Sequence, residues 1–171
     1  MPEPTDLIAE ARRQWLAHWD PAAAPSMVAV TSIMRAHQIL LARLNRLLVP
    51  WELTFARYEA LMLLFYSRRG ALPLGQIGSR LQVHPTSVTN TIDGLERLAL
   101  VVRRAHERDR RMTLAAITEH GRAVAHAATE RLNDARFATD PLEPAELESL
   151  SDTLRRIRLA EGDFVDEQTS G

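Results

Sequence analysis

The chain has 171 residues, 46% of them hydrophobic and 25% charged, and its formal net charge is -1. These values are typical of a globular protein and argue against extensive disorder. The chain contains no cysteine, which excludes disulfides, thiolate catalysis and thiol redox sensing. No apolar run approaches the roughly 20 residues that span a bilayer, and no signal-peptide core follows the N-terminus, so we expect a cytoplasmic protein with no membrane partner.

The near-zero net charge conceals an uneven distribution along the chain. All 21 basic side chains are arginine, and they outnumber the acidic residues between Arg80 and Arg111. Residues 141–171 are strongly acidic by contrast. An anionic partner would therefore meet the middle of the chain and not its C-terminal end.

Two helices are predicted in the first 50 residues. An apolar stripe at four-residue spacing marks the first helix, and it consists of Leu7, Ala11, Trp15 and Trp19. Residues 20–26 contain two prolines and are typical of a linker, with Ser26 capping a second helix from Met27 to Val49. The apolar stripe of the second helix is too broad for a single neighbour and predicts burial in a bundle or in a dimer. Residues 1–50 thus form a unit of two N-terminal helices.

Three helical segments are predicted next, and their order is that of a helix-turn-helix. They begin near Thr54, Pro73 and Pro85, and Pro85 suits the first position of a helix because its missing N–H needs no partner there. The third segment separates an apolar face from a polar face. The apolar face carries Val88, Ile92, Leu95 and Leu98, and the polar face carries Thr86, Ser87, Thr89, Asn90, Asp93 and Arg97.

A β-hairpin is predicted after the third helix. Residues 100–104 and 112–117 have strand-compatible sequences, and an arginine-rich polar tip lies between them. Guanidinium groups on such a tip suit phosphates or a narrow minor groove, and the hydroxyl and amide groups of the third helix can bond base edges in a major groove about 12 Å wide. The alternative is that the polar face of the third helix simply faces solvent and that the arginines of the tip pair with Glu107 and Asp109.

The C-terminal part is predicted to be helical. Thr118 can cap a long helix from Glu119 to about Phe137, and a last helix carries apolar residues at heptad-like spacing. The heptad-like spacing predicts a helix–helix seam, so residues 123–162 form a unit of C-terminal helices. Residues 163–171 are expected to be a frayed tail.

Several stretches of this sequence resemble the MarR family of bacterial transcription regulators. The resemblance covers roughly residues 54–122, and its motifs are residues 74–81, 83–89, 95–101, 109–111 and 117–121. The most specific are Asp109-Arg110-Arg111 and the Thr118-Glu119-x-Gly121 that follows the second strand. The resemblance implies a mainly α fold, a winged helix-turn-helix at residues 51–122 with a short β-hairpin wing and flanking N- and C-terminal dimerisation helices.

The resemblance also implies a function, that of a ligand-responsive repressor that binds a palindromic operator in double-stranded DNA as a homodimer. It places residues 85–97 on the recognition helix and residues 108–111 at the wing, where Asp109 would hold Arg111 toward the DNA. The residues that we expect to contact DNA are Arg80, Pro85, Thr86, Ser87, Thr89, Asn90, Arg97, Arg108, Asp109, Arg110 and Arg111. Ala99 departs from the family, which usually has glycine there, and alanine tolerates a left-handed turn less well.

The resemblance also implies an effector site. A helix carrying Trp15 before the common fold is similar to a urate-responsive subgroup, in which Trp15, Glu59 and Arg103 would line the pocket. Thr91 stands where that subgroup has an arginine, which favours another small aromatic or carboxylate anion. The alternatives are that Trp15 packs in the dimer core and that Arg103 and Glu59 are surface groups, with or without an ion pair.

No cofactor or metal is predicted. No two histidines are four residues apart, and the chain has no phosphate-binding loop, nucleophile elbow or zinc-protease motif, so we do not expect an enzyme. The alternative function is a winged-helix dimerisation or protein-interaction module that does not read DNA.

Overall fold

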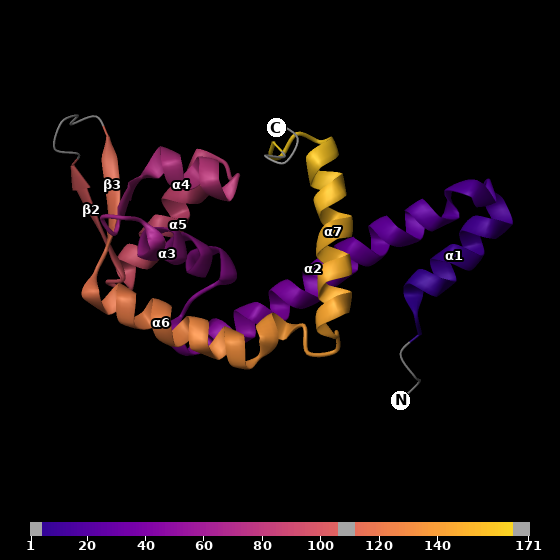
Figure 1. Cartoon of the computed structure of the whole chain (residues 1–171), viewed down its shortest axis with the longest axis horizontal. Coiled ribbons are helices and arrows are strands. Elements are labelled where there is room, and N and C mark those ends of the chain that lie inside the picture. The colour runs from indigo at the N-terminus through magenta and orange to yellow at the C-terminus, as the bar shows by residue number, and fades with distance from the viewer. Residues whose placement is uncertain (1–4, 106–111, 166–171) are drawn as a thin grey trace.

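The structure is a computed structural model that describes residues 5–105 and 112–165 (Figure 1). Its N-terminal part is a helical hairpin of α1 (Leu7–His18) and the 25-residue α2 (Ala24–Leu48), joined by the 3-10 turn η1 (Pro21–Ala23). The linker is shorter than predicted. Helix α2 starts at Ala24 and not after Ser26, because Pro25 fits the first turn of a helix.

The middle of the chain forms a winged helix-turn-helix, as predicted. Its elements are η2 (Val49–Trp51), α3 (Phe55–Tyr66), β1 (Ala71–Pro73), α4 (Leu74–Leu81), α5 (Pro85–Arg97), β2 (Val101–Ala105) and β3 (Thr113–Ile117). Thr54 caps the N-terminus of helix α3, since its Oγ1 accepts a hydrogen bond from the Arg57 N–H at 3.3 Å. We call residues 51–122 the winged half.

The wing has three strands, one more than the predicted hairpin. Strands β2 and β3 pair antiparallel with Arg103 opposite Ala115, and β1 pairs with the other edge of β3, where Leu72 faces Ala115. The sequence of β1 has three residues and ends in proline, so it shows no strand pattern. Its partner β3 is what makes it a strand, and through β1 the wing is tied to the start of α4.

One hydrophobic core lies under the winged half and joins all of its helices. Its fully buried side chains are Leu48, Leu61, Leu64, Ile77, Ile92, Leu95, Leu100, Leu132 and Val101. The predicted inward face of α5 is confirmed, since Val88, Ile92 and Leu95 are buried. Because these apolar side chains are buried, the polar face of that helix points away from the core.

Helices α6 (Glu119–Asp134) and α7 (Pro144–Ala160) follow the wing, with the 3-10 turn η3 (Arg136–Ala138) between them. Helix α6 ends three residues before the predicted Phe137, because residues 136–138 all adopt positive φ angles. Helix α7 begins with a capping box formed by Glu143 and Glu146.

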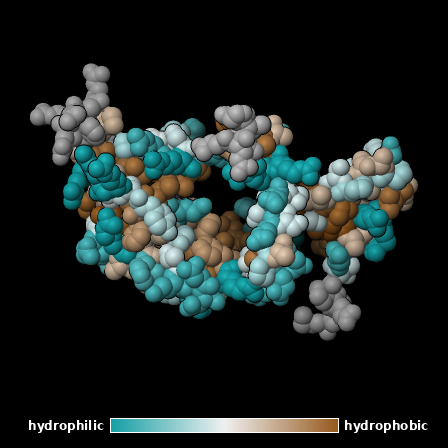
Figure 2. Space-filling model, viewed as in Figure 1, coloured by the Kyte–Doolittle hydropathy of each residue, from teal (hydrophilic) through white to brown (hydrophobic). Residues whose placement is uncertain are grey.

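The helices outside the winged half leave apolar side chains uncovered in the single chain. Neither α1 nor α7 has a buried residue, and Val30, Met34 and Ile157 are among the exposed large hydrophobic side chains. Figure 2 shows a hollow between the winged half and α7 in which hydrophobic surface is visible. These surfaces fit the assignment of residues 1–50 and 123–162 to dimerisation, which stays a prediction.

The start of the predicted frayed tail is held in place. Asp163 accepts hydrogen bonds from Gln82 at the end of α4 and from Arg158 of α7. The ring of Phe164 lies under the guanidinium groups of Arg155 and Arg158, at 4.9 and 5.2 Å from its centroid. Residues 166–171 of that tail lie outside the described residues.

Candidate nucleic-acid interface

The recognition helix α5 presents a compact polar surface. Pro85 occupies its first turn, and the His84 Nδ1 atom accepts a hydrogen bond from the Thr86 N–H at 3.3 Å, which caps the helix. Five of the predicted contact residues are exposed on its first two turns: Pro85, Thr86, Ser87, Thr89 and Asn90. Thr89 donates its hydroxyl proton to the Pro85 carbonyl at 3.2 Å, so that hydroxyl has an acceptor lone pair left for a ligand.

Arg57 of α3 packs against helix α5. A Cβ atom added to Gly94 would lie 2.4 Å from Nε of Arg57, so the guanidinium lies directly on the helix backbone at that glycine. The Arg57 Nη1 atom donates to the Glu52 carbonyl at 3.2 Å, which orients the guanidinium. No functional role for Arg57 or Gly94 was predicted from the sequence. The one sequence feature that could have indicated this contact is a glycine within a helical pattern.

Arg103 connects the wing to the recognition helix. Its guanidinium forms ion pairs with Asp93 and Glu96, and its backbone N–H donates to the Glu96 carboxylate at 3.2 Å. Burial alone would lower the pKa of Arg103, but the hydrogen bonds to Asp93 and Glu96 and their negative charges raise it. Arg103 was predicted as a ligand-binding residue. In this structure its guanidinium is already paired with the two acids of α5, Asp93 and Glu96.

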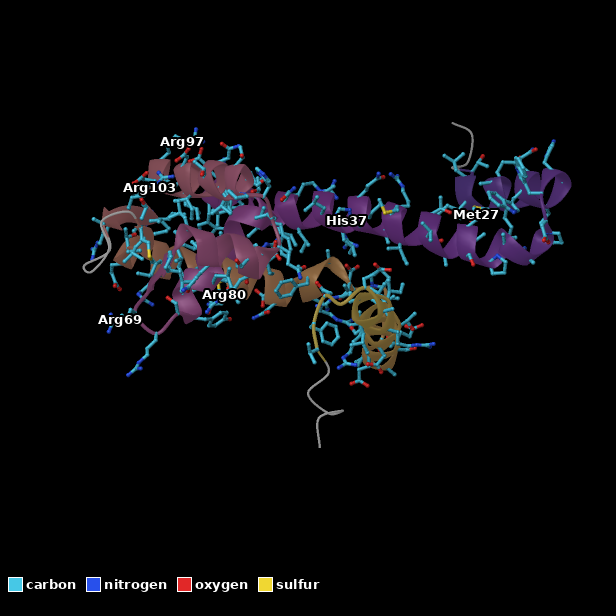
Figure 3. All side chains as sticks on the ribbon, turned by 90° about the horizontal axis from the view of Figure 1, so that it is seen from above. Met27, His37, Arg69, Arg80, Arg97 and Arg103 are labelled. Atoms are coloured by element: carbon cyan, nitrogen blue, oxygen red, sulfur yellow. The ribbon has the colours of Figure 1, made fainter. Side chains whose placement is uncertain are left out.

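The two other predicted arginines of this region lie apart from each other. Figure 3 shows Arg97 beside Arg103 on one side of the winged half and Arg80 away from both. Both Arg97 and Arg80 are exposed. The remaining predicted contacts at the wing tip, Arg108, Asp109, Arg110 and Arg111, lie outside the described residues and stay predictions.

The Thr-Glu-x-Gly motif joins the wing to α6. Thr118 donates its hydroxyl proton to the Ala99 carbonyl at 2.8 Å and accepts a hydrogen bond from the Gly121 N–H at 2.9 Å. A Cβ at Gly121 would lie 2.1 Å from the carbonyl oxygen of Leu100, so only glycine fits there. Ala99 has a φ of 56°, the left-handed conformation that the departure from the family's glycine suggested.

The predicted effector residues do not meet within one chain. The indole N–H of Trp15 donates to the Asp20 carbonyl at 3.3 Å, and its ring lies beside Trp19 at a centroid distance of 6.1 Å. Helix α1, which carries Trp15, lies at the opposite end of the molecule from β2 (Figure 1). Glu59 is exposed on α3 and does not pair with Arg103. A site built from these three residues would need α1 of a second copy.

The described ranges contain neither a metal-binding cluster nor a membrane-spanning helix. Within residues 5–105 and 112–165, no three histidine or acidic side chains are grouped so that they could hold a metal ion. In the same ranges no helix has the length and the apolar character needed to cross a membrane.

The chain is similar to known proteins over the winged half and beyond it. Residues 53–113 match the MarR family model. Sco5413, a MarR family transcriptional regulator from Streptomyces coelicolor, is 49% identical with a TM-score of 0.77, and the match covers 83% of this chain and 99% of that one. The HTH-type transcriptional regulator MhqR of Bacillus subtilis (strain 168) is 34% identical over 89 residues, which are 52% of this chain and 60% of MhqR.

A third similarity concerns the fold alone. Sco3205, a MarR family transcriptional regulator from Streptomyces coelicolor, has been solved in complex with DNA. It is 23% identical with a TM-score of 0.71, and the match covers 82% of this chain and 92% of that one. This chain and Sco3205 therefore share the same fold.

Proposed function

The chain belongs to the MarR family of DNA-binding transcriptional regulators, and on that premise we propose that it is a homodimeric repressor of a palindromic operator. The family is one of regulators and not of enzymes. We propose that it acts in the cytoplasm, where the DNA that it would bind is found.

The observation that carries this proposal is the polar face of α5. Thr86, Ser87, Thr89 and Asn90 are exposed together on the first two turns, and burial of Val88 and Ile92 holds that face outward. Hydroxyl and amide groups on one helical face can bond base edges in the major groove, where each base pair presents a distinct pattern of donors and acceptors. We infer that these four residues read the operator sequence.

The wing supplies contacts of a different kind. Arginine groups bind phosphates and enter narrow minor grooves without reading a particular base pair. Arg103 ties β2 to α5, so this strand of the wing keeps a defined position relative to the recognition helix. We propose that Arg111, with Asp109 as its partner, anchors the protein to the DNA backbone.

Dimerisation is supported by the uncovered apolar side chains of α1, α2 and α7. A second copy related by a two-fold axis would cover them and present a second α5. The two recognition helices would then read half-sites about one helical turn apart, which is the geometry of a palindromic operator.

We propose further that a small aromatic or carboxylate anion releases the DNA. Trp15 of one copy, with Glu59 and Arg103 of the other, would line its site. Because Asp93 and Glu96 already pair with Arg103, an anion at Arg103 would have to displace them, which would loosen the tie between α5 and the wing. Such a loosening is a physical route from ligand binding to DNA release.

The test is selection of bound fragments from genomic DNA of the source organism, followed by footprinting. The proposal expects enriched fragments with an inverted repeat, protection of two half-sites, and affinity that falls steeply with salt because phosphate contacts release counterions. Light scattering on the free protein should give a dimer. An interaction module that does not read DNA would enrich no sequence, and a stable monomer would exclude the proposed operator geometry.

A further inference from the structure

A cavity of about 400 Å³ lies away from the winged helix-turn-helix, where the C-terminal ends of α2 and α6 meet the turn η3. We call it the arginine hollow. Its lining contains the four arginines Arg43, Arg46, Arg131 and Arg136 and the two acids Asp134 and Asp140. The excess of guanidinium groups gives the hollow a positive charge in a chain whose net charge is -1.

Two of the four guanidinium groups have partners within the chain. Arg43 forms an ion pair with Asp140, and the Nη2 atom of Arg136 donates to the Leu142 carbonyl at 2.6 Å. The hydrogen bond from Arg43, together with the charges of Arg43 and Arg136, holds the pKa of Asp140 below its usual value, against a smaller opposing effect of burial. These contacts attach the segment after α6 to the end of α2.

The other two guanidinium groups are unpaired. The guanidinium groups of Arg46 and Arg131 form no hydrogen bond or ion pair with any residue in the described part of the chain, and both side chains are exposed. Each lies in the last turn of its helix, where a cation is favoured by the helix dipole. The dipole explains one arginine per helix, but it does not explain why two of them line the same hollow.

The turn beside the hollow has an unusual backbone. Arg136, Phe137 and Ala138 have φ angles of 47°, 49° and 61°, a left-handed run without a glycine. Such conformations persist only where the surrounding structure imposes them, and they cluster at binding sites and switch regions. Ala138 is buried, and Thr139 donates its hydroxyl proton to the Arg136 carbonyl at 2.6 Å. The strained turn is therefore held from both sides, and two of its residues, Arg136 and Ala138, line the hollow.

We propose that the arginine hollow binds a compact dianion, either a phosphate group or a dicarboxylate, through the guanidinium forks of Arg46 and Arg131. A guanidinium presents parallel N–H donors that match phosphate and carboxylate oxygens in pairs. Two charges on the ligand match the two unpaired guanidinium groups. A bound dianion would join the ends of α2 and α6 and restrain the turn that connects the winged half to α7.

This site is separate from the effector site predicted at Trp15, Glu59 and Arg103, and it does not depend on DNA binding. Its test is therefore made on the free full-length protein. Calorimetric titrations with inorganic phosphate and with succinate, at constant ionic strength in sodium chloride, distinguish the two sources of the dianion. The proposal expects one saturable site per chain for at least one of the two.

The decisive variant is the double substitution Arg46→Gln and Arg131→Gln. It should weaken binding at least tenfold, whereas the control Arg12→Gln and Arg69→Gln, which removes two exposed arginines elsewhere, should bind as the wild type does. The pair Arg46→Lys and Arg131→Lys keeps the charge without the fork and should fall between them, which keeps the test open if the glutamine variant unfolds. Saturable binding by neither anion, or equal binding by the glutamine variant and the control, would overturn the proposal.

A second readout reports on the turn itself. The methyl resonance of Ala138 should shift on titration of the wild type with the anion that binds, and it should stay in place in the glutamine variant. A shift of the same size in both proteins would contradict the proposed position of the site.

Discussion

The guanidinium of Arg103, in strand β2, forms an ion pair with Asp93 in the recognition helix α5. Glu96, one turn further along the same helix, pairs with the other arm of the guanidinium. The wing and the recognition helix are thus connected by side chains as well as by the chain itself. Two elements that we propose to contact one duplex together are thereby held in a defined relative position.

Replacement of Arg103 by alanine should weaken operator binding more than it weakens folding. The ion pairs are partly exposed, so their loss should lower the free energy of unfolding by no more than about 1 kcal/mol. DNA affinity should fall further, because two uncompensated carboxylates would then lie on α5 near the phosphates. Gel-shift titration and thermal unfolding measure the two effects.

The control for that variant is a compensating triple substitution, Arg103→Ala with Asp93→Asn and Glu96→Gln. It removes the repulsive charges and should recover part of the lost affinity. An Arg103→Ala protein that binds the operator as tightly as the wild type would show that the connection has no role in DNA binding.

Substitutions in α5 and at the wing should have different effects on DNA binding. Asn90→Ala should cost about 1 to 3 kcal/mol of binding at particular base pairs and relax the preference there. Arg111→Ala should weaken binding to every sequence about equally and reduce the salt dependence, since a phosphate contact carries no sequence information. Binding to a set of operator variants at two salt concentrations distinguishes these outcomes, and a sequence-selective effect of Arg111→Ala would contradict the assignment.

Ala99→Gly should stabilise the protein. Ala99 has a φ of 56°, which costs an alanine up to about 1 kcal/mol more than a glycine. The matched control is Ala123→Gly, the same substitution at an exposed position within helix α6, which should destabilise by about 1 kcal/mol. Urea unfolding of both variants should give changes of opposite sign, and the same sign in both would refute the argument from φ.

Gly121→Ala should destabilise the winged half. The new Cβ would lie 2.1 Å from the Leu100 carbonyl oxygen, a backbone atom that cannot move without disturbing the wing. Overpacking of this kind typically costs about 1 to 3 kcal/mol. Gly75→Ala is the control, since nothing lies within 4 Å of its Cβ position, and it should be neutral or stabilising within helix α4.

The contact of Asp163 with Gln82 should make stability depend on acid pH. Hydrogen bonds from Gln82 and then Arg158 hold the pKa of Asp163 below the ordinary value of an aspartate side chain. A carboxyl whose pKa is lowered by folding stabilises the protein above its unfolded pKa, and this contribution is lost as the pH falls through the folded value. The melting temperature of Asp163→Asn should therefore lie below that of the wild type at neutral pH and approach it in acid.

The control for that measurement is Asp152→Asn, which removes an exposed carboxylate from helix α7, just before Asp163 in the chain. Its difference from the wild type should be small across the same pH range. A gap between Asp163→Asn and the wild type that persists unchanged into strong acid would show that the carboxylate of Asp163 is not its cause.

The sequence by itself determined the local features of this protein. The helices of the winged half, the inward face of Val88, Ile92 and Leu95, and the strands beside the wing tip all follow from the spacing of apolar and polar residues. Such periodicity is encoded within a few neighbouring residues, so it can be predicted without a fold. The resemblance to the MarR family rested on equally local motifs, and the left-handed backbone at Ala99 was visible as a missing glycine.

The tertiary structure decided which distant residues meet. Strand β1 exists because β3 lies beside it, and Arg103 pairs with Asp93 and Glu96 because the wing folds back on α5. The arginine hollow brings Arg46 and Arg131 together from helices that are far apart in the sequence. No local pattern encodes these contacts, since each depends on how whole elements pack, and packing is settled by the burial of the shared core.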